Sequence, residues 1–194
     1  MSPGKILRLR TTIARPADNT AYQAGDEVSN HATAGSVVRA TFNLAGFRRG
    51  RINEAAIDIL AASSNVVTTA LDLELLIFRT FEAPAAVGDN VTNPITAAQR
   101  ANALAYFRFD DTAWTGPLGT VAAGTSQFQS VAAHVVQPLA TPVLQAIAPR
   151  GAVFSLEDIG SNTPQLTAVL RALAAWTPTG IVNTLGITLD IEAS

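Results

Sequence analysis

The sequence contains no cysteine and few charged residues. Without cysteine, a disulfide framework, a thiolate zinc site, an iron–sulfur cluster and a cysteine nucleophile are all excluded. Charged residues make up 14% of the 194 residues, whereas an average soluble domain has roughly 25%. The net charge is -2, and phosphate binding requires a dense excess of lysine and arginine. We therefore expect no nucleic-acid partner.

The low charge has two possible explanations. Much of the surface is either covered by neutral polar side chains or buried against other chains, because obligate interfaces are depleted of charge at their cores. Hydrophobic residues make up 48% of the chain, which is enough for a sizeable core and excludes disorder for most of it. The length suits one domain, or one domain with an arm.

Long apolar runs are also missing. The basic residues between Lys5 and Arg15 are not followed by an apolar segment, so we expect no signal peptide. The apolar stretch from Leu71 to Phe78 is interrupted by Asp72 and Glu74 and is far too short to cross a bilayer. We expect no membrane partner.

Short alternating segments between glycine- and proline-containing turns are the main pattern in the sequence. Period-two alternation of apolar and polar residues, or enrichment in β-branched and aromatic residues, indicates strands. The expected strands are 5–13, 35–42, 52–60, 71–79, 105–109, 128–136 and 185–192. The pattern predicts an all-β fold, an antiparallel β-sandwich, because helices for parallel crossovers are too few.

Two segments have helical features. Residues 94–101 predict one short helix, with Asn93 as N-cap and Pro94 at the first helical position. Leu166–Ala175 has leucine and valine spaced three and four apart, which favours a helix, but it also suits a buried strand ending at Trp176. Both alternatives stay open for this segment.

Residues able to do chemistry are scattered. His31 and His134 have no partners at helical or hairpin spacing, so neither predicts a metal site or a nucleophile–base pair. No phosphate-binding loop or nucleophile elbow is present. Asp110-Asp111 and Glu157-Asp158 are adjacent in sequence, so they do not indicate the two facing carboxylates of a glycosidase. The loops at Asp26-Glu27 and Asp89-Asn90 have too few oxygen ligands to indicate a calcium loop. We expect no catalytic residues, no metal and no cofactor. A hydrolase is a third hypothesis, which a screen with generic glycoside and ester substrates would test.

One cationic cluster and three aromatic residues suggest contacts with other molecules. Arg48–Arg51 either binds a carboxylate-lined partner or is a solvated hairpin tip. Tyr22, Trp114 and Trp176 favour an alternative function, a carbohydrate-binding β-sandwich module of a phage tail fibre or receptor-binding tip. Burial of both tryptophans in a core or an interface is the more favoured explanation.

Residues 15–30, Arg-Pro-Ala-Asp-Asn-Thr-Ala-Tyr-Gln-Ala-Gly-Asp-Glu-Val-Ser-Asn, resemble the opening stretch of a group of small virion proteins. These are the capsid decoration, or cement, proteins of tailed bacteriophages. Later features fit as well: the turn into a strand at Gly50, the acidic strand at 71–78, the helix at Pro94 and the final strand. The arginine-rich segment at 48–51 departs from the pattern.

The resemblance implies a jelly-roll-like sandwich that assembles as a homotrimer on the outer surface of the head, with the major capsid protein as partner. It also implies that Leu166–Ala175 is a strand. We expect residues 1–30 to form an extended N-terminal arm and residues 31–194 the sandwich. The expected interface residues are Arg8, Arg10, Arg15, Tyr22, Arg48, Arg49 and Arg51.

Overall fold

The structure is a computed structural model, and it describes most of the chain. The described residues are 5–61, 65–67, 71–109, 119–121, 126–132, 152–156, 164–178 and 183–193. His134, Trp114, Asp110-Asp111 and Glu157-Asp158, which the sequence analysis considered, therefore lie outside the described residues.

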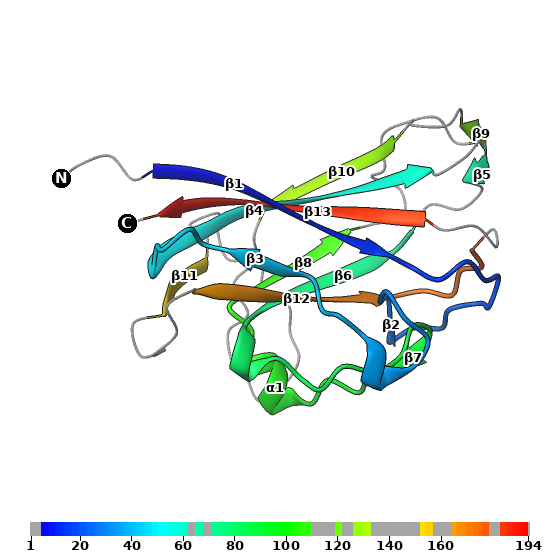
Figure 1. Cartoon of the computed structure of the whole chain (residues 1–194), viewed down its shortest axis with the longest axis horizontal. Coiled ribbons are helices and arrows are strands. Elements are labelled where there is room, and N and C mark those ends of the chain that lie inside the picture. The colour runs from blue at the N-terminus through cyan, green and yellow to red at the C-terminus, as the bar shows by residue number, and fades with distance from the viewer. Residues whose placement is uncertain are drawn as a thin grey trace.

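Two antiparallel sheets stack face to face, as Figure 1 shows, so the predicted antiparallel β-sandwich is confirmed. The five-stranded sheet has the order β1-β13-β4-β10, with β11 also paired to β4. Its strands are β1 (Lys5–Ala14), β4 (Arg49–Ala61), β10 (Ser126–Ala132), β11 (Ala152–Ser155) and β13 (Asn183–Ala193).

The six-stranded sheet has the order β7-β2-β12-β6-β8, with β3 also paired to β12. Its strands are β2 (Asp26–Glu27), β3 (Thr41–Asn43), β6 (Leu73–Arg79), β7 (Val91–Thr92), β8 (Ala105–Phe109) and β12 (Gln165–Ala172). A further antiparallel pair joins β5 (Asn65–Val67) to β9 (Gly119–Val121). The finer jelly-roll description stays a prediction.

The core lies between the two sheets. Alternate residues of each strand point inward, as period-two geometry requires, and they include Ile57, Leu75, Phe107, Ile187 and Leu189, all of them 0% exposed. Full burial of a side chain of this size contributes about 1.5–3 kcal/mol. The sequence pattern finds this inner face correctly.

The outer face of the six-stranded sheet is covered as well. The chain returns from β6 to β8 through α1 (Ala97–Ala101). Leu76, Phe78 and Val169 pack against Ala103, which follows α1, and against Tyr106 of β8. Strand β6 is therefore buried on both faces, including Glu74, which is 2% exposed. The outer face of the five-stranded sheet has no such cover among the described residues.

The ambiguous segment Leu166–Ala175 is resolved as strand β12 over residues 165–172, and the helix alternative is wrong. It pairs with β6 along its length and with β2 and β3 on its other edge. Pairing on both sides and burial in a sheet outweigh a helix preference of a few tenths of a kcal/mol per residue.

Two local predictions need correction. Residues 35–42 are not a strand: a 3-10 turn occupies Ala34–Ser36, Asn30 Oδ1 accepts the Val38 N–H at 2.8 Å, and only β3 is regular. The helix is confirmed but begins later, because Thr96 rather than Asn93 caps it. Thr96 and Gln99 form a reciprocal capping box, while the Asn93 amide is buried against Glu27.

The N-terminal strand is confirmed and lies within the sandwich. Strand β1 pairs with β13 from Lys5 to Ala14 without a break in register. Residues 5–14 therefore have a place in the sheet rather than outside it, and the division of the chain at residue 30 stays a prediction.

Candidate functional site: the outer face of the five-stranded sheet

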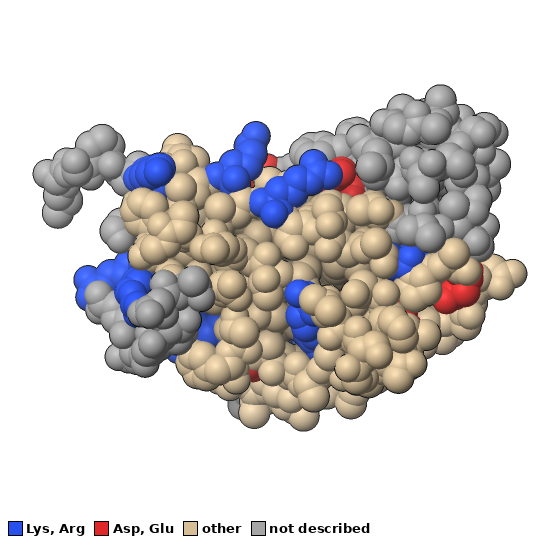
Figure 2. All heavy atoms as spheres, in the orientation of Figure 1, with Lys and Arg blue, Asp and Glu red and all other residues tan. Residues whose placement is uncertain are grey.

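The outer face of the five-stranded sheet, which no other part of the described chain covers, has a regular pattern of side chains. In β1 the even-numbered residues are exposed, and they include Arg8 and Arg10. The same face carries Asp190 on β13, directly opposite Arg8, and Asp58 on β4, opposite Gly186 of β13. Figure 2 shows basic side chains along the rim formed by β1, above a largely uncharged surface.

Both arginines form ion pairs across the sheet. Arg8 donates from Nε and Nη2 to the two carboxylate oxygens of Asp190, at 2.8 and 2.7 Å. This paired geometry lowers the pKa of the Asp190 carboxyl, first through the hydrogen bond from Arg8. The side chains of Arg8 and Arg10 remain 75% and 55% exposed. Such exposed pairs contribute little to stability. Because both side chains are largely exposed, their guanidinium groups are accessible to a partner.

Arg10 reaches past its neighbouring strand. Its Nη2 lies 2.6 Å from Asp58 Oδ2 on β4, two strands away. The guanidinium crosses β13 at Gly186, where an added Cβ would collide with both Arg10 and Asp58. A glycine at this position therefore leaves the space in which the ion pair forms.

Near the amino end of β4 the same face becomes partly apolar. The strand registers place Ile6, Glu192, Arg51 and Val153 in one row across β1, β13, β4 and β11. Ile6 is 74% exposed and Val153 is 71% exposed. A shallow groove beside them is lined by Arg49, Gly50, Arg51, Val153, Phe154, Ser155 and Glu192.

The predicted arginine tip at residues 48–51 is thus partly a strand. Arg49 and Arg51 belong to β4 and are exposed, while Arg48 precedes the strand and is half-buried. The turn before them uses positive φ angles at Ala45 and Gly46. Of the expected interface residues, Arg8, Arg10, Arg49 and Arg51 therefore come together on one face.

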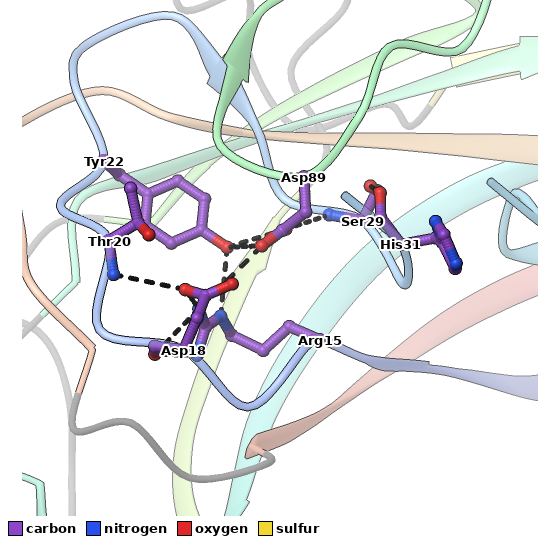
Figure 3. A network of polar contacts seen from close by, with 7 residues as sticks. All are labelled: Arg15, Asp18, Thr20, Tyr22, Ser29, His31 and Asp89. Atoms are coloured by element: carbon purple, nitrogen blue, oxygen red, sulfur yellow. Dashed lines mark hydrogen bonds and ion pairs between the residues drawn. The ribbon is translucent and has the colours of Figure 1, made fainter. Parts of the chain in front are cut away.

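Arg15 and Tyr22 do not belong to this surface. Arg15 is 1% exposed and Tyr22 0% exposed, so the interface expectation is wrong for these two side chains. Figure 3 shows that they form a buried network with Asp18, Ser29 and Asp89. Burial of an arginine is rare without a partner, and here its partners are internal.

Tyr22 and Asp89 connect the members of this network, and Arg15 also donates to the Asp18 carboxylate at 2.9 Å. The Tyr22 hydroxyl accepts a bond from Arg15 Nε at 3.0 Å and donates to the Asp89 carboxylate at 2.6 Å. The Ser29 N–H also donates to Asp89, at 2.8 Å. Burial raises the pKa of both the Tyr22 hydroxyl and the Asp89 carboxyl. The network joins the chain after β1 to the loop before β7.

Neighbouring acidic residues are held in the same way. Glu27 accepts bonds from Arg39 at 3.0 Å and from the Asn93 amide at 2.5 Å, and Asp26 accepts one from the Thr92 hydroxyl at 2.8 Å. Burial raises the pKa of Glu27. Through these bonds the two carboxylates of β2 stabilise the contact with β7 at the edge of the six-stranded sheet.

The aromatic residues behind the carbohydrate-binding alternative are also internal. The rings of Tyr22 and Trp176 stack with centroids 4.4 Å apart and an angle of 5° between planes. Trp176 is 9% exposed. Neither ring offers a free face for a sugar, so the alternative loses these two residues, and the third, Trp114, lies outside the described residues.

Other chemistry is sparse in the described part of the chain. His31 lies in an exposed loop, and its Nδ1 accepts the Thr33 N–H at 3.0 Å. Among these residues no three His, Cys, Asp or Glu side chains form a group that could hold a metal ion. No helix among them is both long and apolar enough to cross a membrane.

The sequence analysis missed several members of the candidate surface. Asp58, Asp190 and Gly186 matter only because strand pairing brings them beside Arg8 and Arg10, which lie 48 or more positions away in the chain. The alternation in 185–192 places Asp190 on the outer face, but no local signal indicates its partner.

Comparison with known proteins finds only weak similarities to solved structures. No protein-family model and no curated protein matches the chain. It is similar to a structure of Desmodium yellow mottle tymovirus, with 15% identity, 100% of this chain and 90% of that chain covered, and a TM-score of 0.28.

Two further structures are a decameric BFDV capsid protein and a virus-like particle of Macrobrachium rosenbergii nodavirus. The first has 10% identity, 98% of each chain covered and a TM-score of 0.28. The second has 12% identity, 100% of this chain and 95% of that chain covered, and a TM-score of 0.30. All three come from viruses, but TM-scores and identities this low support no inference about this chain.

Proposed function

We propose that this chain is a structural protein of a virus particle, a homotrimeric decoration protein on the outer surface of a tailed-bacteriophage head. Its partners would be two further copies of itself and the major capsid protein. The observation that supports this proposal best is the outer face of the five-stranded sheet, which no other described residue covers. It combines exposed Ile6 and Val153 with the arginines of β1 and β4.

The physical features of this face suit attachment over an area. A decoration protein acts in many copies, so modest contacts add up through avidity, and contact area matters more than a deep pocket. Aromatic residues, methionine and arginine are enriched at interfaces while lysine is depleted, and this chain has one lysine beside twelve arginines. The resemblance of residues 15–30 to decoration proteins points the same way.

The first experiment measures assembly. Size-exclusion chromatography with light scattering should give a mass three times the 20.2 kDa of one chain. Purified protein should also bind expanded heads that lack it, visible as added density on the outer surface by electron cryo-microscopy. A strict monomer that leaves such heads bare would refute the proposal.

Variants then test the candidate surface. Arg49→Gln with Arg51→Gln should weaken head binding about a hundredfold or more, because two charge-assisted bonds are lost and each is worth about 1.5–3 kcal/mol when desolvated at an interface. Arg108→Gln is the matched control: Arg108 is 49% exposed and pairs with Asp72 at 3.2 Å, but on β8 of the other sheet. Equal losses in both variants would mean that this face is not the contact.

A further inference from the structure

The groove on the outer face of the five-stranded sheet lies where β11 pairs with the start of β4, and its volume is about 400 Å³. Two neighbouring cross-strand pairs line it, Arg51 with Val153 and Arg49 with Ser155. These pairs are separated by about 6.8 Å along the strands. The side chain of Phe154, between them on β11, points to the core and is 3% exposed. The groove is therefore bordered by outward side chains of both strands.

Arg51 differs from other exposed arginines of the described chain in having no ionic partner. Arg8, Arg10 and Arg108 each form an ion pair with an aspartate. The exposed side chain of Arg51 forms no ion pair or hydrogen bond with the described residues, although Glu192 lies opposite it on β13. All five N–H donors of its guanidinium are thus available to a ligand.

The charges around the groove favour a ligand with a single carboxylate. A guanidinium binds a carboxylate through two parallel N–H···O bonds, which makes this pair both strong and specific. Glu192 lines the same groove and repels a ligand that carries many negative charges, such as a nucleic-acid backbone. One acidic side chain satisfies Arg51 without placing further negative charge beside Glu192.

Aliphatic side chains flank the arginine in the same row across the sheet. Val153 is next to Arg51 on β11, and Ile6 lies at the other end of the row, on β1. They are 71% and 74% exposed. Exposed aliphatic groups contribute to binding when a partner buries them. A segment that presents a carboxylate between two aliphatic side chains matches this row in both charge and polarity.

We infer that this groove binds a glutamate or aspartate side chain of another protein, and that aliphatic residues near it in that protein pack on Val153 and Ile6. In an extended segment, residues two positions apart point to the same side, so an aliphatic residue two positions before the acidic one and another two positions after it fit the row. The inference rests on the proposed function for the identity of the partner, which would be the major capsid protein.

The test is an NMR titration of the full chain labelled with ¹⁵N, with two five-residue peptides. Each has valine at both ends and threonine at the second and fourth positions, and the central residue is glutamate in one and glutamine in the other. The glutamate peptide should shift the amide resonances of residues 49–51 and 153–155. It should bind about fivefold more tightly than the glutamine peptide, a difference of about 1 kcal/mol that is typical of a partly exposed charge pair.

Variants show whether Arg51 provides the charge. Arg51→Gln should remove the preference for glutamate, and Arg51→Lys should keep part of it, because lysine retains the charge without the paired donors. Arg108→Gln is the matched control, since it removes the same charge from an exposed arginine on the other sheet, and it should leave the preference unchanged. The amide spectrum of each variant verifies that it is folded.

Three results would overturn the inference: equal affinity for the two peptides, a preference that persists in Arg51→Gln, or amides of residues 49–51 that shift with the concentration of the chain alone. The last result would identify a second copy as the occupant. Peptide binding in the groove combined with bare heads would instead refute the proposed function and leave the groove assignment in place.

Discussion

The Tyr22 hydroxyl offers a direct test of the buried network. Replacement of Tyr22 by phenylalanine removes one oxygen and keeps the ring that stacks on Trp176 at 4.4 Å. The packing of the core is therefore retained. What is lost is the acceptor for Arg15 Nε and the donor to Asp89.

The expected loss of stability follows from the charge of the two partners. A hydrogen bond to a charged group contributes about 1.5–3 kcal/mol, and a buried partner left unsatisfied adds its desolvation penalty. Asp89 keeps the Ser29 N–H and the Arg15 guanidinium, whose Nη2 lies 3.8 Å away. Because that compensation is partial, we expect Tyr22→Phe to lower the free energy of unfolding by about 3 kcal/mol.

Urea denaturation and thermal unfolding measure this change. For a domain of this size, about 3 kcal/mol corresponds to a fall in Tm of roughly 6–12 °C. Thr80→Val is the control, because it removes an exposed hydroxyl without a charged partner. That hydroxyl donates to the Gln165 carbonyl and accepts a bond from the Thr167 hydroxyl, each at 3.1 Å. A change for Tyr22→Phe no larger than for this control, about 1–2 kcal/mol for its two neutral bonds, would show that the network does not stabilise the fold.

Three further changes test other contacts. Gly88→Ala should destabilise the fold by about 2 kcal/mol or more, because the added Cβ would collide with the backbone carbonyl of Ala32. Gly35→Ala is the control: its Cβ meets nothing within 4 Å, and its Tm should hardly change. Gly186→Ala should cost less than about 1 kcal/mol but abolish the ion pair that crosses this residue, which a double-mutant cycle would detect. Arg8→Gln should raise the pKa of Asp190 in an NMR titration. Because Arg8 lowers that pKa in the folded state, the wild type should lose more stability than the variant as the pH falls through it. An unchanged pKa would exclude the ion pair in solution.

The sandwich itself was predictable because alternation is a local signal. Residues 185–192 alternate cleanly, and β13 occupies 183–193. The signal fails where side chains enter local contacts instead of a sheet. Val37 and Val38 have β-branched side chains typical of strands, yet Asn30 holds this segment in a loop and Val38 is 73% exposed.

The candidate surface was predictable only in part. Exposure of Arg8 and Arg10 follows from the period of β1, but their partners Asp58 and Asp190 depend on which strands pair. Arg15 shows the opposite limit. An arginine before a proline in a turn-rich stretch is normally exposed. Its burial here depends on contacts with Asp18, Tyr22 and Asp89, and Asp89 lies 74 positions later in the sequence.

The position of the buried network also bears on what the resemblance can mean. Its specific part, residues 15–30, supplies Arg15, Asp18, Tyr22 and Glu27, which hold the chain after β1 against the six-stranded sheet. Side chains that bind each other inside the fold are unavailable to a partner, so similarity at these positions concerns how the chain folds. The proposed contact with a partner is therefore expected to depend on residues outside this stretch, such as the exposed arginines of β1 and β4.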